Sequence, residues 1–268
     1  ALHLADRGFH VFATGRRSES LRALKAEAGD GPLDTFVLDV TDAGSISAAV
    51  AEVDRRTQGY GLDALVNNAG YGVLGPLEMI SDNDLRAQFD ANVFGLMAVT
   101  RAFVPKMRER GAGRIVNIGS AGGRITFPIM GAYNASKYAV ESLSDALRRE
   151  LYPFGLRLIL IEPGIVRTEF AERAMKTIGK CGAPDSPYAR LFRRVERIRK
   201  GFDWIGVGPE CVSRAVERAI VGPRPPVRRV VPLRTYAVLA VFRLLPARMA
   251  DRLQLAVLGW NTRPSPSK

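Results

Sequence analysis

Tyr133 and Lys137 are the strongest candidates for chemistry in this sequence. They stand four residues apart in the run Tyr133-Asn-Ala-Ser-Lys137, a spacing that places both side chains on one face of a helix. A tyrosine with its ordinary pKa of about 10 is a poor acid–base catalyst at neutral pH. A nearby lysine cation favours the phenolate and lowers that pKa, so the pair is suited to proton transfer. Taken alone, the same spacing also fits a half-buried tyrosine beside a solvated lysine.

Polar and glycine-rich segments follow three apolar runs that read as strands. Ser120 follows one run, Asn67-Asn-Ala-Gly70 another and Pro163-Gly164 a third, and Asn92 lies in the helical stretch after the second. The carboxyl ends of parallel strands share one edge of a sheet, where α/β enzymes bind ligands. Each segment alone fits an ordinary turn. Together they indicate one site at one sheet edge.

The pattern along the chain predicts an α/β fold. Short β-branched or aromatic runs alternate with segments of helical spacing, which is typical of βαβ units. We therefore predict a single Rossmann-like, doubly wound parallel sheet with helices on both faces. The strands are expected at residues 9–14, 35–40, 62–67, 114–118 and 156–161, and the helices at 18–28, 43–58, 81–110 and 131–152.

With these residues in this order, the chain resembles the short-chain dehydrogenase/reductase family over residues 1 to about 170, and more loosely beyond. The stretch 122–170 and the run Leu244-Leu-Pro-Ala-Arg248 are similar to the retinol dehydrogenase and 17β-hydroxysteroid dehydrogenase branch, especially its bacterial NADP-dependent aldehyde reductases. The resemblance implies an oxidoreductase that transfers hydride between a nicotinamide cofactor and a hydrophobic aldehyde, ketone or alcohol. Retinoids, steroids and lipids are examples of such substrates.

The catalytic residues of that family correspond to Asn92, Ser120, Tyr133 and Lys137. By this resemblance Tyr133 is the general acid that protonates the carbonyl oxygen during reduction, and Ser120 hydrogen-bonds that oxygen. Lys137 is expected to bind the nicotinamide ribose and to depress the pKa of Tyr133. Asn92 is expected to hold a water molecule that links Lys137 to solvent.

Cofactor choice is predicted from the end of the first expected strand. An acidic residue there would bind the ribose 2′-hydroxyl of NAD and repel a 2′-phosphate. This sequence has Gly15, Arg16 and Arg17 instead. Two guanidinium groups and no carboxylate favour the phosphate, so we predict NADP(H).

The resemblance also supplies a wider set of contacts. The substrate pocket is expected to be apolar and to include Phe127, Ile129, Met130, Phe170 and Met175, although ordinary core packing explains two or three of these equally well. The cofactor-binding residues are expected to be Gly15, Arg16, Arg17, Asp39, Val40, Asn67, Ala69, Gly70, Tyr133, Lys137, Pro163, Gly164, Ile165 and Thr168.

One segment of the family pattern is absent from the sequence. The Thr-Gly-x-x-x-Gly-x-Gly turn that receives the pyrophosphate normally lies between a first strand and a first helix. Residues 1–8 read as the end of that helix, closed by Gly8. We interpret the chain as N-terminally truncated, with the first strand and the glycine-rich turn missing, so an N-terminal targeting signal is neither indicated nor excluded.

Positive charge is concentrated near the C-terminus. The protein has 39 basic and 27 acidic residues, a net charge of +12, and the whole excess lies in residues 190–268. We predict a dehydrogenase domain over residues 1–222, with a substrate loop at about 170–205, and a basic, partly apolar extension over 223–268. The extension is expected either to pack on the domain or to contact an anionic membrane surface. A solvated arginine-rich surface is the alternative.

The composition excludes several classes of protein. Two cysteines exclude a disulfide scaffold, and two histidines near the start argue against a metal centre and a Ser-His-Asp triad, so no metal is expected. No segment reaches 18 uncharged apolar residues, so no transmembrane span is predicted. We expect a cytoplasmic homo-oligomer that acts on a small hydrophobic molecule, does not bind nucleic acid, and contacts the inner membrane face peripherally if at all.

Two other functions stay open at this point. A 3-oxoacyl reductase would use the same catalytic residues, and its acidic carrier would be attracted to the basic extension. A non-catalytic protein that senses NADPH and binds a partner is a second alternative. The presence of both Ser120 and Tyr133 argues against the sensor, which has no need of them.

Overall fold

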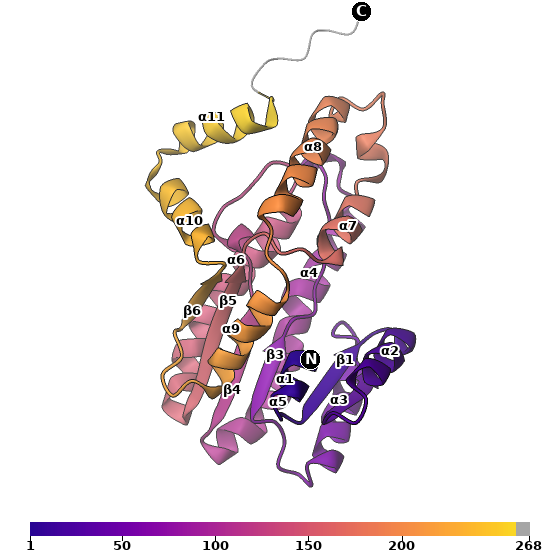
Figure 1. The fold of residues 1–268 in the computed structure, drawn as a ribbon, viewed down its shortest axis with the longest axis vertical. Helices are drawn as coiled ribbons and strands as arrows, with labels where there is room; N and C mark the ends of the chain where they lie inside the picture. Colours follow the sequence, from indigo (N-terminus) through magenta and orange to yellow (C-terminus); the bar gives the residue numbers. More distant parts are fainter. Residues whose placement is uncertain (261–268) are drawn as a thin grey trace, which may run out of the picture.

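The strands run parallel and form two neighbouring sheets (Figure 1). The structure, a computed structural model, describes residues 1–260. One sheet pairs β1 with β2, and the other has the order β3-β4-β5-β6. The bounds are β1 Val11–Gly15, β2 Leu33–Val37, β3 Ala64–Asn67, β4 Gly113–Ile118, β5 Leu156–Pro163 and β6 Arg228–Val231.

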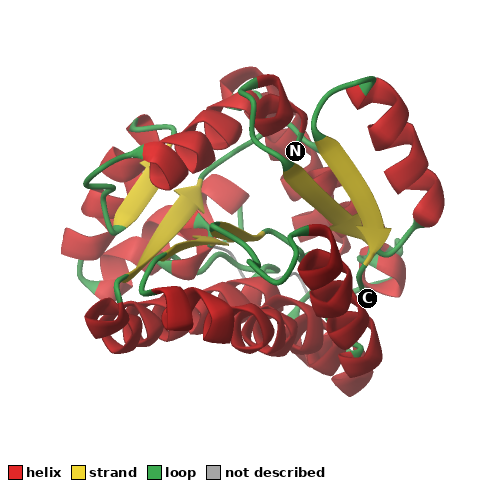
Figure 2. Ribbon diagram, turned by 90° about the horizontal axis from the view of Figure 1, so that it is seen from below, coloured by secondary structure: helices red, strands yellow, loops and turns green. Residues whose placement is uncertain are grey.

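Helices cover both faces of these sheets (Figure 2). Side chains of α3, α5 and α6 pack against one face, and side chains of α1, α2 and α9 pack against the other. This is the doubly wound arrangement expected from the sequence. The bounds are α1 Leu2–Asp6, α2 Ser18–Ala28, α3 Ala43–Arg56, α4 Asp82–Phe89, α5 Leu96–Arg110, α6 Gly131–Leu151, α7 Glu169–Lys176, α8 Ala189–Ile205, α9 Glu210–Val221, α10 Arg234–Leu244 and α11 Ala247–Leu258.

The central strands are apolar on both faces because each face carries helices. Ile115 and Leu158 point into the core shared with α3 and α5. Their chain neighbours Val116 and Ile159 point the other way, into the core shared with α9. Successive side chains of a strand alternate between faces, so two separate cores explain why these strands read as continuous apolar runs.

The two sheets stand apart from each other (Figure 2). Within residues 1–260 no backbone ladder joins β1 to β3. The parallel α/β architecture itself is as predicted from the sequence.

Two expected elements differ in detail. The second strand ends at Val37, before the predicted residue 40, because Asp39 closes a turn by accepting hydrogen bonds from the backbone and side chain of Thr41. The predicted helix 81–110 is interrupted by a π-helical turn, Asp90–Gly95, between α4 and α5. Such turns are frequent at functional sites.

The predicted domain boundary at residue 222 is wrong. Strand β6 lies beyond it and pairs with β5, with Leu160 opposite Arg228 and Pro163 opposite Val231. The sheet therefore extends the dehydrogenase domain to Val231 or beyond. The run Gly222–Pro226, at the predicted boundary, is the connection from α9 to β6.

The C-terminal helices pack on the domain. Leu258 and Trp260 join a cluster with Ile178 and Phe192, and the Trp260 ring stacks on Tyr188 with centroids 5.9 Å apart. This contact accounts for the final tryptophan without any membrane. Residues 261–268 of the predicted extension lie outside the described part. Within residues 1–260, no helix is long and apolar enough to cross a membrane.

Candidate active site

Ser120 stands in a tight turn directly after β4. Its hydroxyl accepts a hydrogen bond from the Gly122 amide at 3.0 Å. The turn is held from below by Asn134 of α6, which is fully buried. The Asn134 side chain donates to the Gly122 carbonyl at 2.8 Å and accepts from the Phe127 amide at 3.2 Å. This one amide therefore fixes the Ser120 turn to the helix that carries Tyr133.

Tyr133 lies next to Ser120 at the start of α6. Its side chain is buried, and the Phe170 ring packs on it with centroids 5.3 Å apart. Burial raises the pKa of the phenol, while a hydrogen bond with Ser120 acts in the opposite direction. The phenol therefore keeps its proton at neutral pH and can donate it, with Ser120 as its polar neighbour.

Lys137 lies one turn further along α6 and is also buried. Its Nζ donates to the Ile118 carbonyl at 2.9 Å and stands 6.0 Å from the centroid of the Tyr133 ring. Burial lowers the pKa of Lys137 to about 8, and the Glu141 carboxylate partly counteracts this effect. The expected depression of the Tyr133 pKa by Lys137 is not seen in this structure, where burial of the phenol dominates.

Asn92 occupies the π-helical turn and is buried. Its carbonyl oxygen accepts from the Tyr71 amide at 3.0 Å. Its nitrogen donates to the Tyr71 carbonyl and to the Ser136 hydroxyl, each at 3.0 Å. Ser136 in turn donates to the Tyr133 carbonyl at 2.7 Å. Asn92 thus joins the loop after β3 to α6, so all four predicted catalytic residues come together.

Sequence reasoning missed the residues that support this loop. Gln88 is fully buried and, like Asn92, uses both ends of its amide: it accepts from Val73 at 2.7 Å and donates to Tyr71 at 2.7 Å. A Cβ on Gly72 would stand 3.0 Å from the Phe170 ring and 3.5 Å from the Tyr133 ring. The only sequence signal for Gln88 is its spacing of four residues before Asn92 on one helical face.

The predicted adenosine-phosphate residues gather beyond β1. Arg16 and Arg17 are exposed after Gly15. Hydrogen bonds from Thr41 lower the pKa of Asp39, and Arg16 lowers it further. Burial raises the pKa of Tyr71, and Arg16 counteracts it. Arg16 is thus close enough to lower the pKa of side chains in the turn after β2 and in the loop after β3. The position after Gly15, where an acidic residue would favour NAD, holds this arginine and no carboxylate.

The other predicted cofactor residues divide into two groups. Ala69, Gly70, Ile165 and Thr168 are exposed at the strand ends, and Pro163 and Gly164 are partly exposed. Asn67 instead points inward: its side chain donates to Asn117 and to Thr100, each at 2.9 Å. The Asn67 side chain is therefore a buried link between β3, β4 and α5 and does not face a ligand. Val40 is partly buried against the core.

The predicted substrate residues do not form one group. Ile129, Met130 and Met175 belong to one apolar cluster with residues of the segment 174–192, and Phe170 covers Tyr133. Phe127 packs elsewhere, against Phe242 of α10 with ring centroids 6.2 Å apart. Phe127 therefore belongs to the contact with the C-terminal helices. Ile129 has a φ of +63°, which is strained for a β-branched residue.

Comparison with known proteins gives consistent matches. Residues 1–179 match the family model for short chain dehydrogenases. The uncharacterized oxidoreductase YbbO of Escherichia coli K12 is 37% identical over 253 residues, which cover 94% of this chain and 87% of that protein. Human 17-beta-hydroxysteroid dehydrogenase type 1 is 36% identical over 249 residues, 85% of this chain and 72% of its own. A solved structure of serine dehydrogenase, its closed form complexed with NADP+, has a TM-score of 0.70 at 31% identity and covers 85% of this chain and 86% of that one.

The close packing around the Ser120 turn predicts a stability loss for Gly122→Ala. The added Cβ would stand 2.5 Å from the Asn134 nitrogen, 3.3 Å from the Ser120 hydroxyl and 3.4 Å from the Tyr133 ring. We expect a loss of about 1–3 kcal/mol in the free energy of unfolding, measured with urea. Gly44→Ala is the control, since its Cβ meets nothing nearer than 3.5 Å. Equal stability of the two variants would contradict the predicted crowding.

Proposed function

The chain belongs to the short-chain dehydrogenase/reductase family, and on that basis we propose that it is an NADP(H)-dependent oxidoreductase acting on a hydrophobic aldehyde, ketone or alcohol. The observation that carries the proposal is the buried Tyr133 phenol beside Ser120, with Lys137 one helical turn away. All three groups lie at the carboxyl end of β4, the sheet edge where ligands bind in α/β enzymes.

In the proposed reaction Tyr133 gives its proton to the substrate carbonyl oxygen. Ser120 donates a hydrogen bond to the same oxygen and so stabilises the negative charge that develops there. Lys137 is then the nearby cation that favours the phenolate left behind. Asn92 holds the loop after β3 against α6 and keeps Tyr133 in place through Ser136. Phe170 and Gly72 close over the phenol and limit the access of water.

The residues of this chain fit NADP(H) at both ends. Arg16 and Arg17 supply guanidinium groups for a 2′-phosphate, and Gly15 leaves space beside them. Exposed Ala69, Gly70, Ile165 and Thr168 stand along the same sheet edge, where the rest of the cofactor would lie. When bound, the reduced cofactor supplies the hydride. The structural neighbour complexed with NADP+ supports this choice of cofactor.

The proposed substrate is hydrophobic, of the size of a retinoid, steroid or long-chain lipid. Ile129, Met130 and Met175 belong to one apolar cluster, and Phe170, which is on the same helix as Met175, lies on Tyr133. Sites of this kind bind ligands mainly through apolar contact, with few polar groups to fix orientation. The similarity to a hydroxysteroid dehydrogenase agrees with such a substrate.

A 3-oxoacyl reductase is the second candidate, favoured by the exposed arginines of α8. Arg190, Arg193 and Arg194 are exposed there, and an acidic carrier would be attracted to them. Such an enzyme would turn over a carrier-linked substrate faster than the free hydrophobic ketone, and salt would reduce that advantage. Faster reduction of the free ketone at all salt concentrations excludes this candidate.

Replacing Tyr133 by phenylalanine tests the proposed acid. We expect Tyr133→Phe to lose about 10²- to 10⁴-fold in turnover, because proton transfer is lost while the ring still packs on Phe170. NADPH binding should stay nearly unchanged. The measurement is NADPH oxidation with a hydrophobic aldehyde or ketone, using protein expressed from its intact gene. Tyr138→Phe, on the exposed side of the same helix, is the control. Undiminished turnover by Tyr133→Phe would refute the mechanism.

Replacing Arg16 by alanine tests the cofactor assignment. We expect Arg16→Ala to weaken NADPH binding by about 10- to 150-fold and to leave NADH binding nearly unchanged, since one charge-assisted hydrogen bond contributes about 1.5–3 kcal/mol. Titration calorimetry with both cofactors measures the change. Arg22→Ala, an exposed arginine on α2, is the control. A wild-type preference for NADH would show the assignment to be wrong.

We also propose that α10 and α11 contact an anionic membrane surface. Val241 and Leu244 of α10 and Leu253 and Val257 of α11 are exposed apolar side chains. Exposed arginines stand among them at positions 243, 248 and 252. Exposed apolar side chains interspersed with arginines are suited to an anionic membrane interface. Trp260 takes no part, because it stacks on Tyr188.

Vesicle sedimentation tests the membrane contact. We expect the protein to pellet with phosphatidylglycerol-containing vesicles at low salt, less so at high salt, and hardly at all with phosphatidylcholine alone. Leu244→Asp should reduce pelleting by placing a carboxylate among these exposed apolar side chains. Val221→Asp, an exposed position at the end of α9, should not. Equal recovery of the protein in the supernatant under every condition would contradict the membrane contact and show that α10 and α11 only pack on the domain.

A further inference from the structure

Two carboxylates lie buried directly behind the proposed catalytic side chains. Glu141 is one turn beyond Lys137 on α6 and is 7% exposed, and Glu162 of β5 is fully buried. Burying two like charges is costly unless cations compensate for them. Neither carboxylate has a part in the proton transfer described above.

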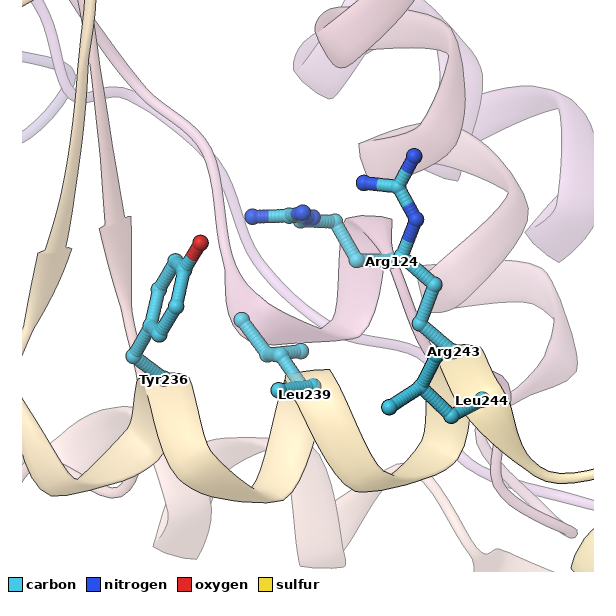
Figure 3. A pocket seen from close by; sticks show the side chains of 6 residues that line it. Arg124, Tyr236, Leu239, Arg243 and Leu244 are labelled. Carbon is cyan, nitrogen blue, oxygen red and sulfur yellow. The ribbon is translucent and has the colours of Figure 1, made fainter.

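Two arginines from distant parts of the chain compensate for the carboxylates. Arg228 of β6 donates to Glu141 and, at 3.0 Å, to Glu162, and it also pairs with Asp145 at 3.0 Å. Arg124, just after the Ser120 turn, donates to Glu162 at 3.1 Å. Figure 3 shows Arg124 reaching over a small cavity toward α10, whose Arg243 also lines that cavity. The cluster therefore ties β6 to the catalytic loop.

One oxygen of Glu141 is turned toward the Ser120 turn and has no partner. Its Oε1 is buried and accepts no hydrogen bond within the described residues. A Cβ on Gly119 would stand 3.1 Å from that oxygen, and a Cβ on Gly123 would stand 2.9 Å from Glu141 Cγ. The backbone at Gly119 and at Gly123, on either side of Ser120, thus packs closely against the Glu141 side chain. Leaving a buried carboxylate oxygen without a partner costs stability.

The charge of Glu141 acts on the pKa of Lys137. Burial, and next the Glu162 carboxylate, raise the pKa of Glu141 to about 7, while Arg228 acts in the opposite direction. Above that pH Glu141 is an anion, and its charge opposes the effect of burial on the Lys137 pKa. The other titratable and charged groups that face this pair are Tyr133, Asp145, Glu162, Arg124 and Arg228.

We propose that Glu141 is a positioning residue that keeps Lys137 protonated and supports the Ser120 turn, with Arg228 holding it in place from β6. The catalytic consequence rests on the proposed function, because it acts on the lysine of that reaction. The electrostatic link between the two side chains is a property of the folded protein and does not depend on any substrate.

The test compares Glu141→Gln with Asp145→Asn. Both remove a carboxylate that pairs with Arg228, but only Glu141 lies one turn from Lys137. A ¹⁵N NMR titration of the Lys137 amine, assigned through its loss in Lys137→Arg, measures the lysine directly. We expect Glu141→Gln to lower the Lys137 pKa by about one unit or more. Asp145→Asn should leave it near the wild-type value, and Glu141→Asp should restore most of it.

The pH dependence of kcat/KM gives a second reading. The fall in activity at high pH should begin at lower pH in Glu141→Gln than in the wild type, whereas a purely structural role would lower activity equally at all pH values. An unchanged Lys137 pKa in Glu141→Gln, or an equal shift in Asp145→Asn, overturns the proposal.

If Glu141→Gln does not fold, the Lys137 NMR titration of the wild-type protein tests the proposal. The Lys137 signal should then show an additional inflection near pH 7, where Glu141 ionises, and its absence overturns the proposal. If the wild type reduces no carbonyl compound, the proposed function fails, but the NMR titration still decides whether Glu141 controls the charge of Lys137.

Discussion

Burying the Lys137 amine at the carboxyl end of β4 imposes a cost that its surroundings must offset. The Ile118 carbonyl accepts its hydrogen bond, and the Glu141 carboxylate opposes the effect of burial on its charge. The hydrogen bond from Lys137 to Ile118 joins α6 to the end of β4, and Glu141 lies on the same helix as Lys137. The Ser120 turn, held by Asn134, must then fit the space that remains, and the glycines at 119, 122 and 123 are there because larger residues would collide. Tyr133 and Ser120 meet as a result of this packing.

The parts of the site that could be predicted are those that depend on local spacing. The four-residue interval from Tyr133 to Lys137 sets a shared helical face, and Ser120 after an apolar run sets a strand-end hydroxyl. The structure has both. Asn67 also follows the pattern of a strand-end turn, yet its side-chain nitrogen donates hydrogen bonds to Asn117 and Thr100 in the interior. Nothing in its local sequence distinguishes an asparagine that faces a ligand from one that links two strands.

Long-range packing explains why the other sequence predictions differ from the structure. Phe127 pairs with Phe242, more than a hundred positions away, so its sequence neighbourhood carries no sign of that contact. Strand β6 follows a proline-rich run that is typical of a linker, so the local sequence does not indicate a strand there. Arg228 pairs with Glu141, Asp145 and Glu162 only because β6 lies beside β5 in the sheet. The π-helical turn at Asn92 requires the loop after β3 as a hydrogen-bond partner. Two further long-range contacts join the C-terminal segment to the rest of the domain: Arg228 donates to Glu162, and the Trp260 ring stacks on Tyr188.

Deuterium transfer is the measurement that tests the central claim most directly. The wild-type protein, expressed from its intact gene, is incubated with NADPH deuterated at the transferring position of its nicotinamide and with hydrophobic ketones and aldehydes. Mass spectrometry of the products then locates the label. The account predicts an alcohol with one deuterium on the former carbonyl carbon and a solvent-derived proton on its oxygen. Absence of any labelled alcohol, with NADPH shown to be bound, would contradict it.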